Sequence, residues 1–210
     1  VIFAIVVILA NVFDQNVTAL AAGLGVGGVS VALASKESLE NLLGSFTIFL
    51  DKPFQVGDII TIGNITGKVE KVGFRSTRVR TFDKSVVTVP NKNLVIAELD
   101  NLGVRPVRRV KINIGLTYST TVNQIKEIVD DIQKLIDDHE QTNQDGKVRF
   151  LNFGASSLDV MVLYYVNSPD WDVLVDTQQE INFKIIEIVK KHGSDFAYPT
   201  TSVFLENQKN

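Results

Sequence analysis

A chain of 210 residues has room for one large domain or for two to three small ones, and a hydrophobic content of 45% is enough for a packed core. The absence of cysteine excludes disulfides, thiolate zinc sites and cysteine nucleophiles. The two histidines, His139 and His192, lie among charged residues, so we expect them at exposed helix ends, and we expect no metal site and no cofactor. The net charge of −3 hides three zones: residues 1–50 carry one base and three acids, residues 51–108 ten bases and six acids, and residues 109–210 ten bases and fifteen acids.

Two apolar segments at the start of the chain are typical of membrane helices. Residues 1–12 are almost wholly apolar but too short to cross the roughly 30 Å hydrocarbon core of a bilayer, so we expect the end of a helix that begins upstream. A polar turn at Asp14 precedes residues 17–34, which carry no charge and are rich in glycine and alanine. In water each glycine would destabilise such a helix by up to about 1 kcal/mol relative to alanine, whereas bilayers tolerate glycine better. This pattern favours a membrane helix over a buried soluble hairpin.

A second helical pattern follows, over residues 38–50. Its apolar residues recur at spacings of three and four, as in an amphipathic helix, and they are Leu39, Leu42, Leu43, Phe46 and Leu50. We expect this helix to lie along the membrane interface. One straight helix over residues 17–50 would be about 51 Å long, so we expect a bend near residues 35–38 or at Gly44.

After the second helix the chain consists of short segments in which apolar and polar residues alternate. Glycine punctuates these segments, which predicts a small antiparallel β-barrel or sandwich over residues 51–108. Three glycines, Gly57, Gly63 and Gly67, suit the turns between its strands.

The last part of the chain alternates strands and helices. The order is strand, helix, two strands, helix and strand, which predicts an α+β domain of ferredoxin-like type over residues 109–203. Two amphipathic helices would cover one antiparallel sheet. Residues 204–210 would form a tail.

The glycine-rich segment also matches a nucleotide-binding pattern. Residues 23–28, GLGVGG, satisfy G-x-G-x-x-G, and Asp51 follows roughly twenty residues further on, as a dinucleotide-binding fingerprint requires. The mechanism requires a buried strand before the first glycine, yet the preceding residues 19–22 read ALAA, and no repeated β-α units follow. A nucleotide-dependent oxidoreductase therefore stays the weaker alternative, and we expect no enzyme activity.

Plotting residues 20–34 at 100° per residue separates the apolar from the small side chains. One narrow stripe holds Ala22, Val26, Val29 and Leu33. Small residues flank it on both sides, with Gly25, Gly28 and Ala32 on one side and Gly23, Gly27, Ser30 and Ala34 on the other. Two small flanks suit a ring of close-packed identical helices, with the stripe facing the axis as an apolar constriction that closes by losing water. The alternative is an ordinary packing helix buried in lipid.

With these motifs in view, the chain resembles the small-conductance mechanosensitive channel (MscS-like) family over nearly its whole length. The resemblance is carried by residues 23–45 (GLGVGGVSVALASKESLENLLGS), by residues 51–91, which hold Pro-Phe, Gly-Asp and Val-Pro-Asn in order, and by residues 154–166 (GASSLDVMVLYYV). It implies a homoheptamer with a pore-lining membrane helix, a Sm-like β domain and an α/β domain that together enclose a cytoplasmic chamber. It also implies opening by membrane tension, with release of ions and small osmolytes during hypoosmotic stress.

The resemblance also assigns roles to residues of the pore helix. The constriction would lie at Val29 and Leu33, and the helix-packing residues would be Ala22, Gly25, Gly28, Ser30 and Ala32. Glu37 stands where the family usually has its kink glycine, which leaves Glu37 or Gly44 as the hinge. Lys36 and Glu37 would place charges at the pore end. The partners implied are membrane lipids, further copies of the chain, ions and osmolytes.

A third hypothesis is a membrane-tethered RNA-binding protein. It depends on Arg75, Arg78 and Arg80, which lie close together in the basic β region. No series of aromatic residues accompanies them and the following domain is acidic, so we expect no nucleic-acid partner. The basic residues after the apolar helix favour an inner-membrane, multi-pass protein with cytoplasmic C-terminal domains.

Overall fold

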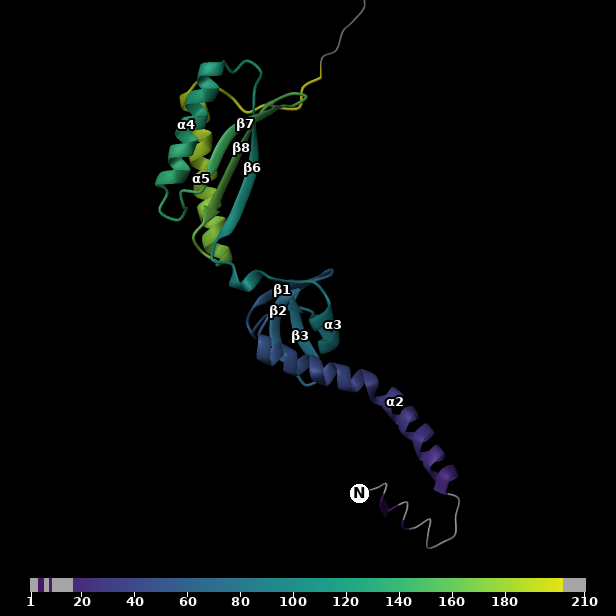
Figure 1. Cartoon of the computed structure of the whole chain (residues 1–210). Coiled ribbons are helices and arrows are strands. Elements are labelled where there is room, and N and C mark those ends of the chain that lie inside the picture. The colour runs from purple at the N-terminus through teal and green to yellow at the C-terminus, as the bar shows by residue number, and fades with distance from the viewer. Residues whose placement is uncertain (1–3, 6–7, 9–16, 202–210) are drawn as a thin grey trace, which may run out of the picture. The chain divides into compact units, whose positions relative to one another are not determined.

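The computed structural model of the chain describes residues 4, 5, 8 and 17–201, so the predicted tail and most of the predicted first helix lie outside the described residues. The chain divides into two compact units, one ending at Gly103 and the next beginning at Val104 (Figure 1). Each unit has a hydrophobic core of its own.

The first unit begins with a single long helix, α2 (Val17–Asp51), of 35 residues. It contains both segments that the sequence separates, the uncharged one and the amphipathic one. Helical hydrogen bonding continues through Glu37 and Gly44, and Figure 1 shows α2 changing direction partway along its length. The helix ends before Pro53, where Lys52 takes a positive φ of 49°. Among the described residues, no helix has an apolar stretch long enough to cross a membrane.

A five-stranded antiparallel sheet follows α2. Its strands are β1 (Ile59–Ile62), β2 (Ile65–Val72), β3 (Ser76–Thr81), β4 (Val86–Pro90) and β5 (Leu99–Asn101), in the spatial order β4-β3-β2-β1-β5. A short helix, α3 (Asn91–Ile96), connects β4 to β5, and a 3₁₀ turn, η1 (Leu102–Val104), follows β5. The core of this unit contains Ile60, Val69 and Val79 from the sheet together with Ile48 from α2. The antiparallel β unit agrees with the sequence prediction, while its Sm-like character stays a prediction.

The glycines of this unit have different tasks. Gly57 and Gly63 adopt positive φ values of 107° and 52° in turns, as predicted. The prediction for Gly67 is wrong, because Gly67 lies inside β2, opposite Thr81. A Cβ at Gly67 would lie 2.7 Å from the carbonyl carbon of Arg80 and 2.9 Å from Cγ1 of Val79. Close approach of the neighbouring strand therefore requires glycine there.

The second unit is a three-stranded antiparallel sheet covered by two helices. The elements follow in the order β6 (Arg108–Leu116), α4 (Val122–Asp138), β7 (Lys147–Phe153), β8 (Leu158–Val166) and α5 (Trp171–Lys191). The strand order is β6-β8-β7, with α4 and α5 on one face of the sheet (Figure 1). These are the first five elements of a ferredoxin-like arrangement. The sixth, the strand predicted after residue 200, lies outside the described residues.

The helices of this unit form because their ends are capped and their inward positions are apolar. Thr121 and Gln124 make a reciprocal capping box at the start of α4, and the Asp170 carboxylate accepts from the backbone N–H of Asp172 at the start of α5. Isoleucine and valine recur every fourth residue on the buried faces, at Ile128, Ile132 and Ile136 of α4 and at Ile181, Ile185 and Val189 of α5. These side chains pack on the alternate residues of β8.

Both histidines lie at helix ends, as predicted, but the prediction that they are exposed is wrong. The His139 side chain is 7% exposed and the His192 side chain 14%. Each follows the last residue of its helix and lies near a carboxylate of the other helix.

We predict that Gly67→Ala destabilises the first unit by about 1–3 kcal/mol, because the added methyl group would overlap the backbone of β3. Thermal unfolding of the purified chain, followed by circular dichroism, measures the effect. Thr88→Ala, on the exposed side of β4, is the control and should change stability by less than about 0.5 kcal/mol. Equal unfolding midpoints for Gly67→Ala and the unsubstituted chain would contradict the close packing of β2 and β3.

Candidate functional site

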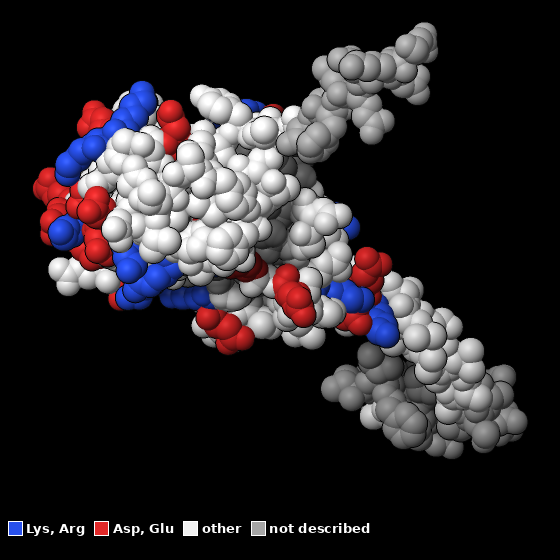
Figure 2. Space-filling view, turned by 90° about the horizontal axis from the view of Figure 1, so that it is seen from above, with Lys and Arg blue, Asp and Glu red and all other residues white. Residues whose placement is uncertain are grey.

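The N-terminal half of α2 is an apolar rod with no charged side chain between residues 17 and 34. Large apolar side chains are exposed on two opposite sides of it, with exposed fractions of 56% for Leu24, 70% for Val26, 61% for Val29, 67% for Val31 and 69% for Leu33. Figure 2 shows this half of α2 as an uncharged surface that ends at a mixed group of acidic and basic side chains. A helix that is apolar all round requires an apolar surrounding.

The two residues predicted to form a constriction are one helical turn apart. Val29 and Leu33 therefore point to the same side of α2. Among the described residues, a Cβ at Gly25 or Gly28 would meet no atom within 4 Å other than those of its own stretch of helix, so the predicted packing glycines have open space beside them. The flanks of the stripe are thus free to receive close neighbours.

The polar side chain within this rod has its hydrogen bond inside the helix. The Ser30 hydroxyl donates to the Val26 carbonyl at 2.9 Å. A hydroxyl bonded back to its own helix avoids the large cost of an unpaired polar group in an apolar medium. Ser30 is therefore compatible with an apolar environment as well as with close packing.

The weaker alternative, a nucleotide-binding site at the glycine-rich segment, finds no support in the structure. Residues 23–28 lie within α2, where the backbone N–H groups are part of the helix, and the described residues directly before the first glycine, 17–22, are helical too. A dinucleotide fingerprint needs a strand, a glycine turn and a helix N-terminus at that place. Among the described residues, no group of three or more histidine, aspartate or glutamate side chains could hold a metal ion.

Charged residues mark the middle of α2. The Lys36 ammonium lies 3.9 Å from the Glu40 carboxylate, one turn further on. Glu37 is exposed, and its carbonyl accepts from the Asn41 side-chain amide at 2.9 Å. The helix is continuous at Glu37, so its role as a hinge stays a prediction.

Gly44 lies where α2 passes close to the backbone of α3. A Cβ at Gly44 would lie 3.0 Å from the carbonyl carbon of Asn91 and 3.0 Å from the backbone nitrogen of Lys92. Both of these atoms belong to the first turn of α3, which cannot move aside like a flexible side chain. Gly44, predicted as a hinge, therefore has a packing task that the sequence does not reveal.

Polar groups complete the junction around Gly44. The Asn41 side chain is buried, and its oxygen accepts from the backbone N–H of Lys92 at 3.1 Å. The Lys92 ammonium donates to the Glu40 carboxylate. This hydrogen bond lowers the pKa of Glu40 and raises the pKa of Lys92. An N-terminal amide and a side chain of α3 are thus both held by α2.

Asn91, of the Val-Pro-Asn motif, connects α3 to the sheet. Its side-chain oxygen accepts from the Thr77 hydroxyl at 2.9 Å, and its side-chain amide donates to the Gly73 carbonyl at 2.7 Å. Its backbone N–H donates to the Arg75 carbonyl at 3.0 Å. Asn91 is fully buried, so the loss of these bonds would leave unpaired polar groups inside the unit. The motif therefore links α2, through α3, to the loop between β2 and β3.

The apolar side of the amphipathic segment does not pack on the sheet. Asn41, Gly44 and Ile48 are buried toward the β unit, while the apolar residues that carry the amphipathic pattern stay outside, except for the half-buried Leu42. Their exposed fractions are 54% for Leu39, 63% for Leu43, 55% for Phe46 and 73% for Leu50. A second apolar surface is therefore available along the C-terminal half of α2.

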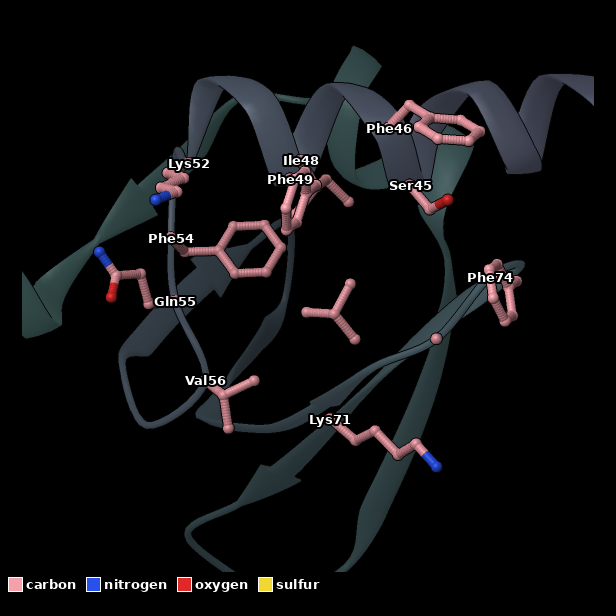
Figure 3. A pocket seen from close by; sticks show the side chains of 12 residues that line it. Ser45, Phe46, Ile48, Phe49, Lys52, Phe54, Gln55, Val56, Lys71 and Phe74 are labelled. Atoms are coloured by element: carbon pink, nitrogen blue, oxygen red, sulfur yellow. The ribbon is translucent and has the colours of Figure 1, made fainter.

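An apolar groove continues this outer surface. It has a volume of about 850 Å³ and lies between the end of α2, the segment after it and the loop between β2 and β3. Figure 3 shows Phe54 pointing into the space beneath α2, with Val56 and Phe74 along its sides and the Lys71 ammonium extending away from it. This surface was not predicted, because its residues come from three separate segments.

The arginines of the RNA-binding hypothesis do not act together as a free basic patch. Arg80 is paired with the Glu70 carboxylate and also donates to the Lys84 carbonyl at 2.7 Å. The hydrogen bond from Arg80 lowers the pKa of Glu70. One of the three cations is therefore neutralised locally, and this weakens the nucleic-acid hypothesis further.

Comparison with known proteins gives these two units a family. Residues 37–103 match the family model described as mechanosensitive ion channel, beta-domain, which defines the class of the first unit and its junction. Residues 110–196 match the model described as mechanosensitive ion channel MscS, C-terminal. The chain belongs to the MscS family.

Relatives and solved structures agree with this assignment. An uncharacterised MscS family protein of Aquifex aeolicus is 40% identical over 97% of this chain and 57% of its own length. The small-conductance mechanosensitive channel MscMJ of Methanocaldococcus jannaschii is 41% identical over 91% of this chain and 55% of its own length. The cryo-EM structure of Arabidopsis thaliana MSL1 has the same fold, with a TM-score of 0.79 and 24% identity over 91% of this chain and 69% of that one. The chain spans little more than half the length of these two curated relatives.

We predict that Gly44→Ala weakens the junction of α2 with α3 and lowers the free energy of unfolding of the first unit by about 1–3 kcal/mol. The physical reason is the contact of the new methyl group with backbone atoms of Asn91 and Lys92. Thermal unfolding measures this effect, with Ser45→Ala as the control, because Ser45 bonds only to the Leu42 carbonyl of its own helix. If both variants unfold like the unsubstituted chain, Gly44 has no packing role.

Proposed function

We propose that this chain is the pore-forming part of a mechanosensitive ion channel that membrane tension opens. The observation that carries the proposal is the continuity of α2: one helix holds an uncharged half with large apolar side chains on two opposite sides and a second half fixed to the β unit. A relative of known activity supports it, since MscMJ is named a small-conductance mechanosensitive channel. No catalytic group is needed for this function.

The proposed gate consists of rings of Val29 and Leu33. Several copies of α2 would pack through Ala22, Gly25, Gly28, Ser30 and Ala32, which lets their backbones approach closely. The apolar stripe would then face the axis, and a narrow apolar ring loses its water and blocks ions. Lys36 and Glu37 would place charges near the end of this pore. Exposed apolar side chains and open glycine flanks on α2 support the arrangement.

Tension would act by favouring the state with the larger area in the membrane. A ligand or a force shifts a conformational equilibrium only through a difference between the two states, and here that difference is the area multiplied by the tension. The junction at Asn41, Gly44 and Lys92 would hold the C-terminal half of α2 on the β unit while the uncharged half tilts and spreads. The change of direction within α2 lies between the uncharged half and the half that the β unit holds (Figure 1).

The whole assembly is proposed as a homoheptamer in the inner cell membrane, with further membrane helices upstream. The β unit, of Sm-like type, and the α+β unit would enclose a cytoplasmic chamber through which ions and small osmolytes leave during hypoosmotic stress. Membrane lipids would contact the outer apolar face of α2. The basic residues after the uncharged segment support a cytoplasmic position for both units.

Electrophysiology on excised membrane patches tests the proposal. The full-length protein, expressed in cells that lack other stretch-activated channels, should give currents that appear under suction and disappear on its release. Patches from cells without the protein are the control. A normally inserted protein without any stretch-activated current would contradict the function.

We predict that Leu33→Ser lowers the tension at which the channel opens, or leaves a current at zero tension. Keeping a leucine side chain out of water is worth about 1.5–3 kcal/mol, so a hydroxyl at the constriction removes much of the barrier to wetting. Val31→Ser is the control, because Val31 lies on the opposite side of α2 from the stripe. An unchanged threshold for Leu33→Ser, or an equal change for Val31→Ser, would remove Leu33 from the gate.

A further inference from the structure

The C-terminal end of α5 brings a histidine between two carboxylates of α4. His192 follows the last residue of α5 and lies beside the first half of α4. Its Nδ1 is 3.1 Å from Oε2 of Glu127, and its Nε2 is 2.9 Å from Oδ2 of Asp131. The two helices lie side by side on the same face of the sheet (Figure 1). Both ring nitrogens of one imidazole are thus engaged with α4.

The chemistry of the imidazole ring restricts the protonation state that fits this geometry. An ionised carboxylate only accepts hydrogen bonds, and a neutral imidazole has one N–H donor and one lone pair. A neutral ring at His192 would therefore point a lone pair at one of the two carboxylates. Only the doubly protonated ring can donate to Glu127 and Asp131 together. The geometry is that of an imidazolium held between two anions.

The other groups around the ring are consistent with a cation there. Lys191 reaches Asp131, with its Nζ 3.0 Å from the carboxylate, and the uncharged Gln124 of α4 donates to the His192 carbonyl at 2.8 Å. The hydrogen bond from His192 is the main cause that lowers the pKa of Asp131, and the one from Lys191 comes second. The C-terminal end of a helix also favours positive charge. The charged groups facing the ring are thus two acids of α4 and, through Asp131, one base of α5.

The second histidine has a different arrangement and serves as an internal reference. Nδ1 of His139 accepts from the backbone N–H of Gln141 at 3.1 Å, which requires that this nitrogen carries no proton. Nε2 of His139 lies 3.5 Å from the Glu180 carboxylate and is buried. This arrangement fits a neutral ring.

We propose that His192, Glu127 and Asp131 form a proton-operated clasp between α4 and α5. The clasp closes when the ring carries two protons and loosens when it loses one, so its contribution to stability is present at low pH and is lost as the pH rises. Imidazole is the side chain whose charge ordinarily changes between about pH 5 and pH 8. The stability contributed by Asp131 depends on pH in the opposite direction. Because the pKa of Asp131 is lowered in the folded protein, this stability is lost only when the pH falls far enough to protonate the carboxylate. The proposal does not depend on the channel function.

Hydrogen exchange of the full-length protein at several pH values tests the clasp. After correction for the intrinsic pH dependence of exchange, amides in the first turns of α4 and the last turns of α5 should exchange about three- to tenfold more slowly at pH 6 than at pH 8. Asp131→Asn should remove most of this difference, because an amide no longer provides the charged acceptor. Asp130→Asn removes the same charge from the neighbouring, exposed position and should keep the difference.

A second measurement reads the protonation state directly, in case a variant folds poorly. The chain has only two histidines, so selective nitrogen-15 labelling of histidine gives two ring systems in the nuclear magnetic resonance spectrum. At pH 6 the His192 ring should show two protonated nitrogens. A neutral His192 ring at pH 6, exchange that does not change with pH, or equal effects of Asp130→Asn and Asp131→Asn would each overturn the proposal.

Discussion

The approach of α2 to the first turn of α3 is the constraint on which the arrangement of the first unit depends. At Gly44 the absence of a side chain lets the two backbones meet. A Cβ at this position would lie only 3.0 Å from backbone atoms of Asn91 and Lys92. The Asn41 side chain holds the same turn by its backbone N–H, and Asn91 extends the connection to the loop between β2 and β3. A long helix is thereby fixed to a sheet along one narrow line, and its remaining sides stay free.

Those free sides explain why one helix can have two environments. Before residue 35, α2 has no charge and its one described hydroxyl, that of Ser30, is bonded within the helix. After that residue, the helix buries Asn41, Gly44 and Ile48 and keeps most of its leucines and its phenylalanines outside. A surface of this kind is stable only when lipid or other chains cover it. The fold thus places the apolar part and the anchored part on the same helix.

Sequence periodicity predicted the elements that depend on local pattern. Isoleucines at every fourth position of α4 gave a helix of the α+β unit correctly, because this pattern reports one buried face. The sequence could not predict where two backbone segments come close together. Glycine is needed at positions 44 and 67 because of the backbone that lies opposite each of them in the folded unit. The apolar stripe of residues 38–50 indicated a helix but not which side packs on the sheet. The burial of His192 depended likewise on another helix far along the chain.

Imaging of the full-length protein in lipid, by cryo-electron microscopy, tests the central claim most directly. The account predicts a closed ring of identical subunits in which α2 lines the axis, Val29 and Leu33 point inward, and the small residues on both sides of them contact neighbouring copies of α2. It further predicts that α2 stays in contact with α3 at Gly44 in every subunit. A structure in which Val29 and Leu33 face lipid, or in which α2 lies away from the axis, would contradict it.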